Sequence, residues 1–548
     1  MGLKTHLTRL SEQDLTAEYA CLNALQQTEW RVNQNVFKVI RQLWDNGQEV
    51  GNLPAREDTP LPNYHFSKEP SEMNDEEKST FRIWSRKRAE IYSTNNRSVS
   101  KRIQVERTLQ VAEQFAKYDK FYYVWQNDFR SRKYASSTFL TPQSADWSKS
   151  LLEFGYPVPI DNWDDARWLC IHGANLYGND KITLDKREAW AWDYVDEAHR
   201  IADNPYDNRA WLDADKPFQF LAWCYEMSAL AKFGWGYESR LPVSADGSCN
   251  GLQHLSAILR DEVGGVATNL ISSDVPQDIY TQVADQAIQR IRQEDTELGR
   301  KCLEFGIDRK LAKRPVMIVP YSGTKHACRA YIEEAIKEKI KEGTPNIFGD
   351  DLFNVTHYLA GHIWDSISGV IVSARKVMDY VKSVGDVYSN MGKHMEWVTP
   401  TGWLVMQQYN ELQQKRIKTH INGEVVSLSF PKDKEDTVNK QRTGLGSSPN
   451  FIHSLDASAM TRTINEATKV GIVDFAMVHD SYGTHSSMMP QLSEILREQF
   501  VSMYEEHDVL DELRTHAIKT LGTEDVPLPP SKGNLDIRNV LKSEYFFA

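Results

Sequence analysis

Residues 475–485, FAMVHDSYGTH, join a short apolar run to a polar corner. Up to Val478 the run predicts a buried strand, and the residues after it predict a tight turn in which Gly483 lets the chain turn back. Asp480 then lies at the tip of a hairpin, where an ionised carboxylate is costly unless a cation or a hydrogen-bond donor faces it. The stretch alone fits an ordinary turn as well as a functional site, because Asp and Gly are both common in turns.

A second carboxylate at the end of a strand occurs in residues 241–260, LPVSADGSCNGLQHLSAILR. Apolar residues alternate at its start, which predicts a strand that ends at Asp246. Gly247 and Gly251 are expected to loosen the backbone before a helix over residues 252–259. The loop does not match a calcium site, because it lacks the third-position Asp or Asn and the bidentate Glu.

Residues 309–329, RKLAKRPVMIVPYSGTKHACR, combine cations with a tyrosine. Arg309, Lys313 and Tyr321 are spaced by multiples of four, so a continuous helix would place them on one face. Cations at this spacing can bind a polyphosphate, and the ring can contact a sugar or a base. Surface cations beside a core tyrosine are an equally open interpretation. Two prolines predict that the helix kinks or ends near Val319.

The composition is that of a large folded protein. The chain has 548 residues, 41% of them hydrophobic, and a formal net charge of −12, which argues against a uniformly basic nucleic-acid binder. Its length predicts about three subdomains. The six cysteines occur singly, with no CxxC pair, so neither a zinc site nor a disulfide framework is indicated. No apolar run could span a bilayer and the N-terminal residues do not form a signal peptide, so we expect a cytoplasmic protein with no membrane partner.

Local basic segments can still fit a nucleic-acid backbone. Residues 82–107 carry eight Lys or Arg against two Glu, and residues 121–134 (FYYVWQNDFRSRKY) place Arg130 and Arg132 among aromatic residues. Such segments can hold phosphates and stack on bases. A solvated helix face and ordinary cation–π contacts produce the same patterns, so both interpretations stay open.

A β-hairpin is predicted over residues 417–428, where Asn422-Gly423 separates two alternating segments. Its charged flanks suit a DNA groove, although an exposed ribbon would have the same pattern. The other expected elements are helices at 33–43 and 75–118, a polar loop at 51–74, two strands within 396–409, a helix after PNFIHSLD (449–456), and a packed aromatic tail, EYFFA, at 544–548.

Taken in order, these motifs resemble those of the bacteriophage-type single-subunit DNA-dependent RNA polymerases, a family that includes mitochondrial enzymes. The order is a strand–Asp–Gly–helix at Asp246, RxxxKR followed by Tyr321, His-Asp-Ser on a hairpin at Asp480, and a C-terminal Phe-Phe-Ala. The resemblance extends from about residue 20 to the last residue. Four short stretches add to it: LRDEVGG (259–265), WVTP (397–400), PNFIHS (449–454) and KGNLDIR (532–538).

The resemblance implies an α+β, mostly helical right-hand fold with palm, fingers and thumb and a small antiparallel palm sheet. The specificity hairpin of such a fold would read promoter DNA in the major groove. The implied divisions are an N-terminal helical remnant (1–32), a thumb-like arm (33–118), palm segments (119–156, 237–262, and 454–548 with the tail), a palm insertion (157–236), and fingers (263–453) that include the specificity hairpin at about 415–435.

By the same resemblance, Asp246 and Asp480 are the palm carboxylates that bind two Mg²⁺ ions, and the Gly247 carbonyl lies beside a metal. Two such ions can activate the 3′-hydroxyl of the growing chain and stabilise the pyrophosphate leaving group. Arg309 and Lys313 would hold the triphosphate and offset the charge that develops on it, so Lys313 is counted as catalytic with the two aspartates.

The resemblance also implies roles for further residues that match positions of the family's motifs. Lys181 matches a phosphate-contacting lysine, Tyr321 the tyrosine that helps to select ribose, and His453 the histidine that contacts the nascent base pair. Arg130 and Arg132 match positions near the template and the hybrid. A polar group that meets the 2′-hydroxyl is what distinguishes ribonucleotides from deoxyribonucleotides.

The implied activity is synthesis of RNA from NTPs on a DNA template, in the cytoplasm of a phage-infected bacterial cell. Two departures from the family pattern bear on it. Tyr321-Ser322-Gly323 replaces Tyr-Gly, and His326 stands where an aromatic residue is usual, which affects fingers closure. The sequence begins near the start of the thumb, so we expect promoter opening to need a separate subunit or a single-stranded DNA-binding protein.

Two alternatives have to be weighed against this interpretation. A DNA polymerase of the related right-hand family would share both aspartates and the fingers cations, although Tyr321 and His453 argue against it. A non-catalytic DNA-binding remnant would have no need to keep Asp246, Lys313 and Asp480 together.

Overall fold

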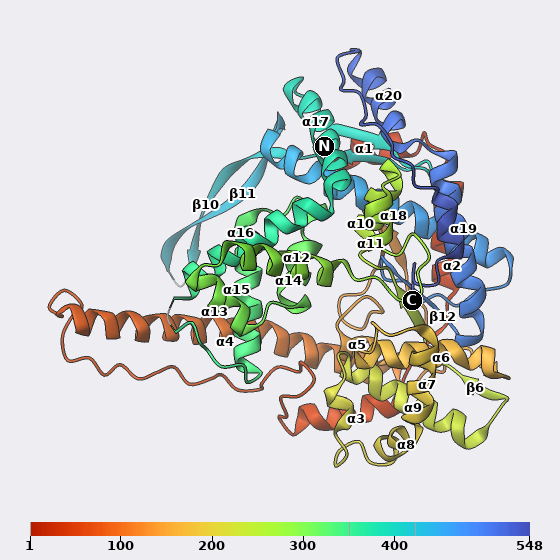
Figure 1. The fold of residues 1–548 in the computed structure, drawn as a ribbon, viewed down its shortest axis with the longest axis horizontal. Coiled ribbons are helices and arrows are strands. Elements are labelled where there is room, and N and C mark those ends of the chain that lie inside the picture. The colour runs from red at the N-terminus through yellow and green to blue at the C-terminus, as the bar shows by residue number, and fades with distance from the viewer. Residues whose placement is uncertain (1, 350, 422) are drawn as a thin grey trace.

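The computed structural model describes residues 2–349, 351–421 and 423–548, and it is mostly helical with short antiparallel strand pairs (Figure 1). This agrees with the predicted α+β class. No helix within these ranges is both long enough and apolar enough to cross a membrane. The strand pairs are β1 (Trp30–Val32) with β4 (Leu152–Phe154), β2 (Trp125–Asn127) with β3 (Lys133–Ala135), β5 (Val158–Ile160) with β6 (Tyr237–Ser239), β7 (Val243–Asp246) with β12 (Ser481–Thr484), β8 (Met395–Val398) with β9 (Leu404–Gln407), and β10 (Asn410–Ile421) with β11 (Glu424–Val438).

A long helical arm, α4 (Asp75–Phe115), projects from the body of the protein (Figure 1). Its start is fixed by a capping box in which the Asn74 side chain and the Glu77 side chain each accept from the other residue's amide. The loop before it runs back along the helix, where the Trp84 indole donates to the Asn63 carbonyl. The predicted loop and the two predicted helices on either side are confirmed. The helices that precede α4 are α1 (Gly2–Leu10), α2 (Thr16–Gln27) and α3 (Gln34–Asp45).

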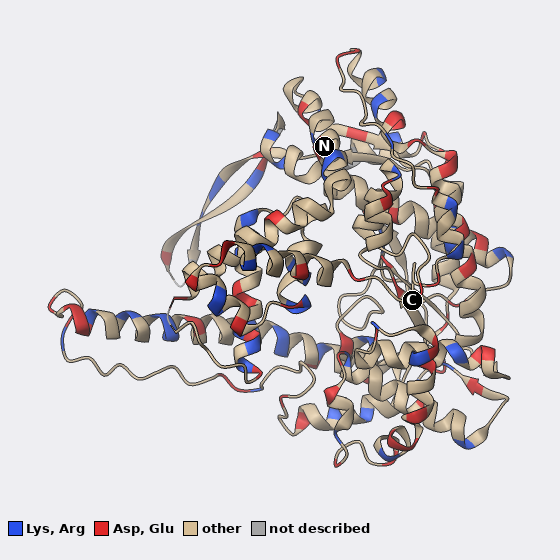
Figure 2. Cartoon of the chain, in the orientation of Figure 1, with Lys and Arg blue, Asp and Glu red and all other residues tan. Residues whose placement is uncertain are grey.

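Lys, Arg, Asp and Glu residues occur all along this arm (Figure 2). Within the predicted basic run, Arg102 contacts Asp58 of the loop, while the acidic Glu106 accepts from the Trp44 indole of α3. Most of the remaining Lys and Arg side chains of the run are exposed, which leaves both interpretations of the basic stretch open.

The buried aromatic residues of α9 (Pro217–Phe233) pack against the helices that precede it in the chain. The Trp223 indole donates to the Leu169 carbonyl at 2.9 Å and passes so close to Gly173 that a Cβ there would lie 2.1 Å from the ring. Gly173 is therefore required by packing rather than by backbone conformation. The neighbouring helices are α5 (Asp146–Lys149), α6 (Trp163–Tyr177), α7 (Leu184–Asp193), α8 (Val195–Asp203) and the 3₁₀ turn η1 (Ala210–Asp213).

The helix that carries Arg309 and Lys313, α14 (Arg309–Met317), ends as predicted near Val319. A 3₁₀ turn, η2 (Val319–Tyr321), follows it, and Ser322 then adopts a left-handed φ of +59°. The other helices of this half are α10 (Asn250–Leu259), α11 (Glu262–Ala267), α12 (Ile279–Glu294), α13 (Glu297–Phe305), α15 (Lys325–Lys341), α16 (Leu352–Val370) and α17 (Val372–Asn390).

The prediction that a helix begins after PNFIHSLD is wrong, because these residues lie inside α18 (Lys440–Lys469). A proline inside a helix is normally costly. Here Phe451, Ile452 and Leu455 are all buried, and contacts with α2, α10, α17 and α19 (Met489–Glu506) surround the helix, so tertiary packing outweighs the cost at Pro449.

The predicted hairpin is confirmed as β10–β11 and is longer than expected, since it spans residues 410–438. Gly423 has a φ of +86°, as the predicted turn requires, while Asn422 lies outside the described residues. The two strands within 396–409 are also confirmed, as β8 and β9. The C-terminal elements are the 3₁₀ turn η3 (Ser486–Met488), α20 (Val509–Leu521) and the 3₁₀ turn η4 (Ile537–Lys542).

A buried carboxylate, Glu396 on β8, ties together segments that are far apart in the sequence. It accepts from Arg9 of α1 at 2.8 Å and contacts His516 and Thr520 of α20, each at 3.2 Å. Burial alone would raise its pKa, but the hydrogen bonds from His516 and Arg9 lower the pKa to about 2. The ionised form is therefore strongly favoured in the folded state.

Replacing Glu396 with Gln should lower the free energy of unfolding by about 2–3 kcal/mol at pH 7, because charge-assisted hydrogen bonds are lost. A carboxyl whose pKa is depressed on folding contributes stability above its ordinary pKa of 4.5 and loses it as the pH falls through about 2. The difference between wild type and variant in urea titrations should accordingly be constant near neutral pH and shrink below pH 4.5. A difference that grows on acidification would contradict this account.

Candidate active site

The hairpin that contains Asp480 is confirmed, with a different turn from the one predicted. Val478 and Ser481 exchange backbone hydrogen bonds of 3.0 and 2.9 Å, so His479 and Asp480 form a two-residue turn. His479 supplies the left-handed conformation, with a φ of +54°. The apolar run before it is not a continuous strand, although the Ala476 amide donates to the Gly483 carbonyl at 2.8 Å.

The glycines near the site serve close packing, which corrects the prediction that they let the chain turn or loosen. A Cβ on Gly483 would lie 2.9 Å from the Ala476 carbonyl oxygen, and one on Gly247 would lie 2.9 Å from the Phe547 ring. Gly251 is similarly close to Pro320. The left-handed residue before α10 is Cys249, with a φ of +64°.

The pairing of β12 with β7 brings the two strand-end aspartates together. Ser481 lies opposite Asp246 in the ladder, and the Gly247 amide donates to the Asp480 carbonyl at 3.1 Å. Enclosure by the cleft walls, together with the charges of Asp456 and Asp246, raises the pKa of Asp480 to about 6. Two carboxylates in this arrangement repel each other, so a cation between them would be stabilised.

Asp246 faces the same cleft but has cationic neighbours. Its side chain is 57% exposed, and the Lys216 ammonium lies 3.5 Å from its Oδ2 atom. Enclosure opposes ionisation, but the charges of Lys216 and Lys149 and a hydrogen bond from Ser481 keep the pKa of Asp246 below its ordinary value. Lys216 also acts on its own neighbours: burial and this ammonium together lower the pKa of His172 to about 4.

A cleft of about 450 Å³ connects the aspartates to the helix of cations. Its lining includes seven of the residues predicted for the site: Lys181, Asp246, Gly247, Arg309, Lys313, Tyr321 and Asp480. These come from segments separated by up to three hundred residues, and the fold gathers them around one volume.

The cations on the α14 side are held by different neighbours. Arg309 donates to Asp278 at 3.0 Å and its guanidinium lies over the Tyr280 ring. Lys313 is exposed to the cleft, and partial burial together with the Arg309 charge lowers its pKa. Lys181, which also lines the cleft, pairs with Asp180 at 3.0 Å.

The remaining predicted residues form a second cluster on α18 behind Tyr321. The Tyr321 and His453 ring centroids are 4.8 Å apart. Arg130 donates to Nδ1 of His453 at 2.9 Å, and since an arginine has no acceptor, His453 carries its proton on Nε2. Burial and the charges of Arg132 and Arg130 lower the pKa of His453 to about 3, so the ring is neutral at physiological pH.

Asp456 is a member of this cluster that the sequence did not reveal. It accepts from Arg132 and from Asn250, both at 2.7 Å, and its side chain is 3% exposed. It thereby joins α18 to the start of α10. Asp456 lies three residues after His453, so a helix would place both on one face, but nothing in the sequence indicated which charged side chain would face Asp456. Lys149 and Lys216 were missed for the same reason.

Aromatic residues near the end of the chain support the loop that carries Asp246. Gly247 forms a β-bridge with Phe547, Gln253 donates to the Phe546 carbonyl at 2.9 Å, and the Phe547 ring contacts Tyr482. Both phenylalanines are buried. The expectation that the aromatic tail is packed is confirmed, and it packs directly against the site.

Residues 162–527 match the family model described as DNA-dependent RNA polymerase. The chain belongs to this family. Polymerases from three sources are among its relatives: DNA-directed RNA polymerase 1, mitochondrial, of Arabidopsis thaliana is 33% identical over 99% of the chain, and the enzymes of Enterobacteria phage T3 and Escherichia phage T7 are each 32% identical over the whole chain. The aligned part is 55% of the plant enzyme and 66% of each phage enzyme.

The predicted resemblance to phage-type single-subunit RNA polymerases is thus confirmed. The chain spans between about half and two thirds of the length of these relatives. Both the phage and the mitochondrial branches occur among them, so the comparison does not favour one cellular setting.

Proposed function

We propose that the chain synthesises RNA from ribonucleoside triphosphates on a DNA template. The observation that carries the proposal is the single cleft that Asp246, Asp480 and Lys313 line. Two carboxylates and several cations around one volume suit a nucleotide whose phosphates bridge metal and protein. A DNA polymerase of the right-hand class is not favoured, because the family match is to RNA polymerases.

The proposed architecture is a right hand. The palm would comprise residues 119–156, 237–262 and 454–548, which include the β7–β12 pair; the fingers would comprise residues 263–453, which include the β10–β11 hairpin; and the thumb-like arm would comprise residues 33–118, which include α4. The division boundaries remain those expected from the sequence, and the hairpin is proposed to read promoter DNA.

The residues fit a hard divalent cation such as Mg²⁺. Among the described residues no three carboxylate, imidazole or thiol side chains converge to hold a metal by themselves. Asp246 and Asp480, with the Gly247 carbonyl, offer oxygen donors and leave positions for water and substrate phosphates, which is the coordination that Mg²⁺ usually has in such sites. Two bound ions would lower the pKa of the attacking 3′-hydroxyl and neutralise the leaving pyrophosphate.

The chain's own groups have separate proposed tasks. Arg309, Lys313 and Lys181 bind the triphosphate, and Lys313 stabilises the charge that develops as pyrophosphate leaves. Arg130 and Arg132 contact the template or the hybrid. Tyr321 and the Nε2–H of His453 face the incoming sugar and the nascent base pair.

The proposal is tested by extension of an RNA primer annealed to a DNA template, with NTPs and Mg²⁺. We expect template-directed addition of ribonucleotides, and no addition in excess chelator. The same assay on duplex promoter DNA tests the expectation that a separate factor opens promoters. A protein that binds the scaffold but adds no nucleotide under any metal condition would refute the proposal in favour of a DNA-binding remnant.

Replacing Tyr321 with Phe should relax sugar selection. The tyrosine hydroxyl lies at the N-terminal end of α10, 3.3 Å from where a Cβ on Gly251 would be, and both residues line the cleft proposed to bind the nucleotide. Loss of one hydrogen bond should reduce the preference for rNTP over dNTP about tenfold. Competition assays measure this ratio, with Tyr331→Phe on α15 as the control. An unchanged ratio would count against the assigned role.

Replacing Lys216 with Met should tighten metal binding. The Lys216 ammonium lies 3.5 Å from the Asp246 Oδ2 atom. Its positive charge offsets the negative charge that would otherwise attract a metal ion. An exposed ion pair of this kind contributes less than about 1 kcal/mol, so we expect the affinity for a divalent metal ion to rise about two- to fivefold. Calorimetric titration with Mn²⁺ measures it, and Lys232→Met, near the far end of α9, serves as the control. Weaker binding in the Lys216 variant would show that Lys216 instead supports the site.

A further inference from the structure

Arg130 and Arg132 are presented by a hairpin loop that is docked on one helix. Moving along the hairpin, Arg130 contacts His453, Arg132 contacts Asp456, and Lys133 contacts Ala457 and Thr461, all on α18. Asp128 supports the loop from within, because its carboxylate accepts from the amides of Arg130 and Arg132 at 2.8 and 3.1 Å.

The loop has a conformation that normally requires glycine. The Ser131 amide donates to the Asp128 carbonyl at 3.0 Å, and the Asp128 amide donates to the Arg132 carbonyl at 2.9 Å, which closes a three-residue hairpin loop between β2 and β3. In such loops the third residue is left-handed and is usually Gly. Ser131 occupies this position with a φ of +70°, and it is fully buried. A non-glycine residue here needs compensation from its surroundings.

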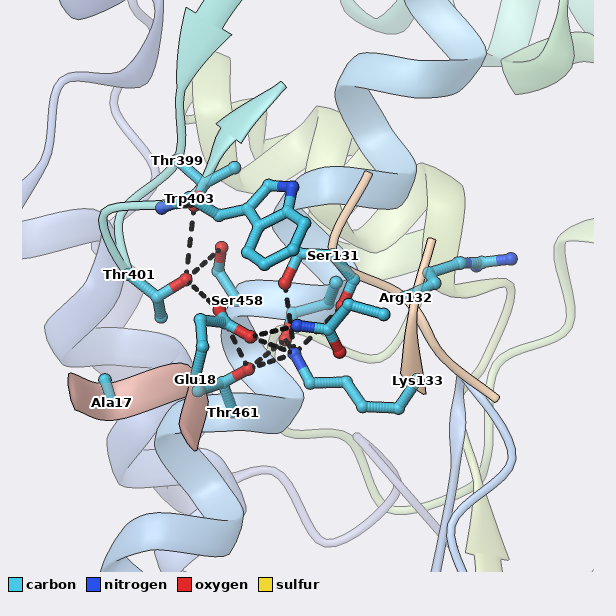
Figure 3. Close-up of polar contacts among 12 residues, drawn as sticks. Ala17, Glu18, Ser131, Arg132, Lys133, Thr399, Thr401, Trp403, Ser458 and Thr461 are labelled. Carbon is cyan, nitrogen blue, oxygen red and sulfur yellow. Dashed lines mark hydrogen bonds and ion pairs between the residues drawn. The ribbon is translucent and has the colours of Figure 1, made fainter. Parts of the chain in front are cut away.

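Lys133 supplies that compensation. Its ammonium donates to the Ser131 carbonyl at 2.9 Å and contacts the Ser131 hydroxyl at 3.2 Å. It also pairs with Glu18 of α2 at 2.8 Å, and both side chains are almost completely buried. Figure 3 shows Lys133 pointing into this cluster while Arg132, the preceding residue, points away from it.

Glu18 is itself fixed on several sides. Its Oε1 atom accepts from the Thr401 hydroxyl at 2.6 Å, and its Oε2 atom accepts from the Asn127 amide group at 3.0 Å as well as from Lys133 (Figure 3). Burial would raise the pKa of Glu18, but the charge and hydrogen bond of Lys133 lower it, so the pair is ionic. Removing one member alone would leave an uncompensated buried charge.

We propose that Lys133, with Glu18 as its counter-ion, is a positioning residue that holds Ser131 in the left-handed conformation and so directs Arg130 and Arg132 toward the nucleic acid. The inference rests on the proposed function, since it takes the two arginines to contact the template or the hybrid. It assigns to a buried ion pair, whose two residues do not line the cleft, a role in nucleic-acid affinity.

The test compares three variants by binding and by thermal unfolding. Glu18→Gln/Lys133→Met removes both charges while keeping similar volumes, a replacement that folded proteins commonly tolerate. The triple variant adds Ser131→Gly, which makes the left-handed conformation inexpensive without Lys133. Ser131→Gly alone is the control. The affinity for a fluorescein-labelled RNA primer–DNA template scaffold is measured by anisotropy without NTPs.

We expect the double variant to unfold cooperatively but to bind the scaffold about tenfold more weakly. Ser131→Gly should restore the affinity of the triple variant to within about twofold of wild type, which a purely stabilising ion pair would not predict. Wild-type affinity in the double variant, or no recovery in the triple variant, would overturn the inference.

If the double variant does not fold, Ser131→Val decides the question, because it leaves Glu18 and Lys133 paired while making the left-handed conformation costly. Weakened binding is again expected, and unchanged binding would overturn the inference. The binding measurement does not depend on catalysis. If wild type fails to extend RNA, the proposed function is refuted, whereas the scaffold affinities of the variants still test the role of Lys133.

Discussion

Replacing Asp480 with Asn should reduce the rate of nucleotide addition by about three orders of magnitude, because one of the two carboxylates proposed to bind metal is lost. The amide is nearly isosteric, so packing of the two-residue turn is kept. Enclosure and neighbouring acids raise the pKa of Asp480 to about 6, so the ionised side chain opposes folding at neutral pH when no metal is bound. The variant should therefore melt no lower than wild type. Single-turnover extension of a labelled primer and a metal-free thermal melt measure the two effects.

Asp203→Asn at the end of α8 is the matched control, since this residue is exposed and lies outside the cleft lining. It should leave both the rate and the melting temperature unchanged. Residual activity of the Asp480 variant within about tenfold of wild type would exclude the assigned metal-binding role.

Replacing Lys313 with Met should lower the rate of addition about a hundredfold, as expected when one charged donor to a developing anion is removed. The side chain faces the cleft, and partial burial with the neighbouring Arg309 charge lowers its pKa. The loss should appear in the maximal rate as well as in the apparent affinity for NTP, because the developing charge is largest in the transition state. Pre-steady-state extension at varied NTP concentration separates the maximal rate from the apparent affinity for NTP.

Lys310→Met provides the control on the same helix, because Lys310 pairs with Glu342 of the adjoining segment and does not line the cleft. It should retain wild-type kinetics. An Lys313 variant whose maximal rate is unchanged and whose NTP affinity alone falls would show that the lysine binds substrate without stabilising the transition state.

Features that depend on neighbouring residues in the chain could be predicted from the sequence. The cost of a carboxylate at the end of an apolar strand made Asp246 and Asp480 candidate site residues, and the end of α14 near Val319 followed from the chemistry of proline. The order of motifs linked these separate positions, and the family match agrees with that link.

The parts that could not be predicted depend on contacts between distant segments. Lys216 meets Asp246, and Asp456 meets Arg132, through packing that no local pattern records. The close-packed Gly483 was taken for a turn residue because the space around a glycine is invisible in the sequence. Pro449 misled in the opposite direction, since its buried neighbours Ser448, Asn450 and Phe451 and the packing of α18 against other helices keep it inside that helix.

The most direct test of the central claim is a single-nucleotide extension assay with four scaffolds that differ only in the templating base. The account predicts that the purified chain, with Mg²⁺, adds the complementary ribonucleotide to the RNA primer on each scaffold and that Asp480→Asn does not. Addition that ignores the templating base, or equal addition by wild type and variant, would contradict it.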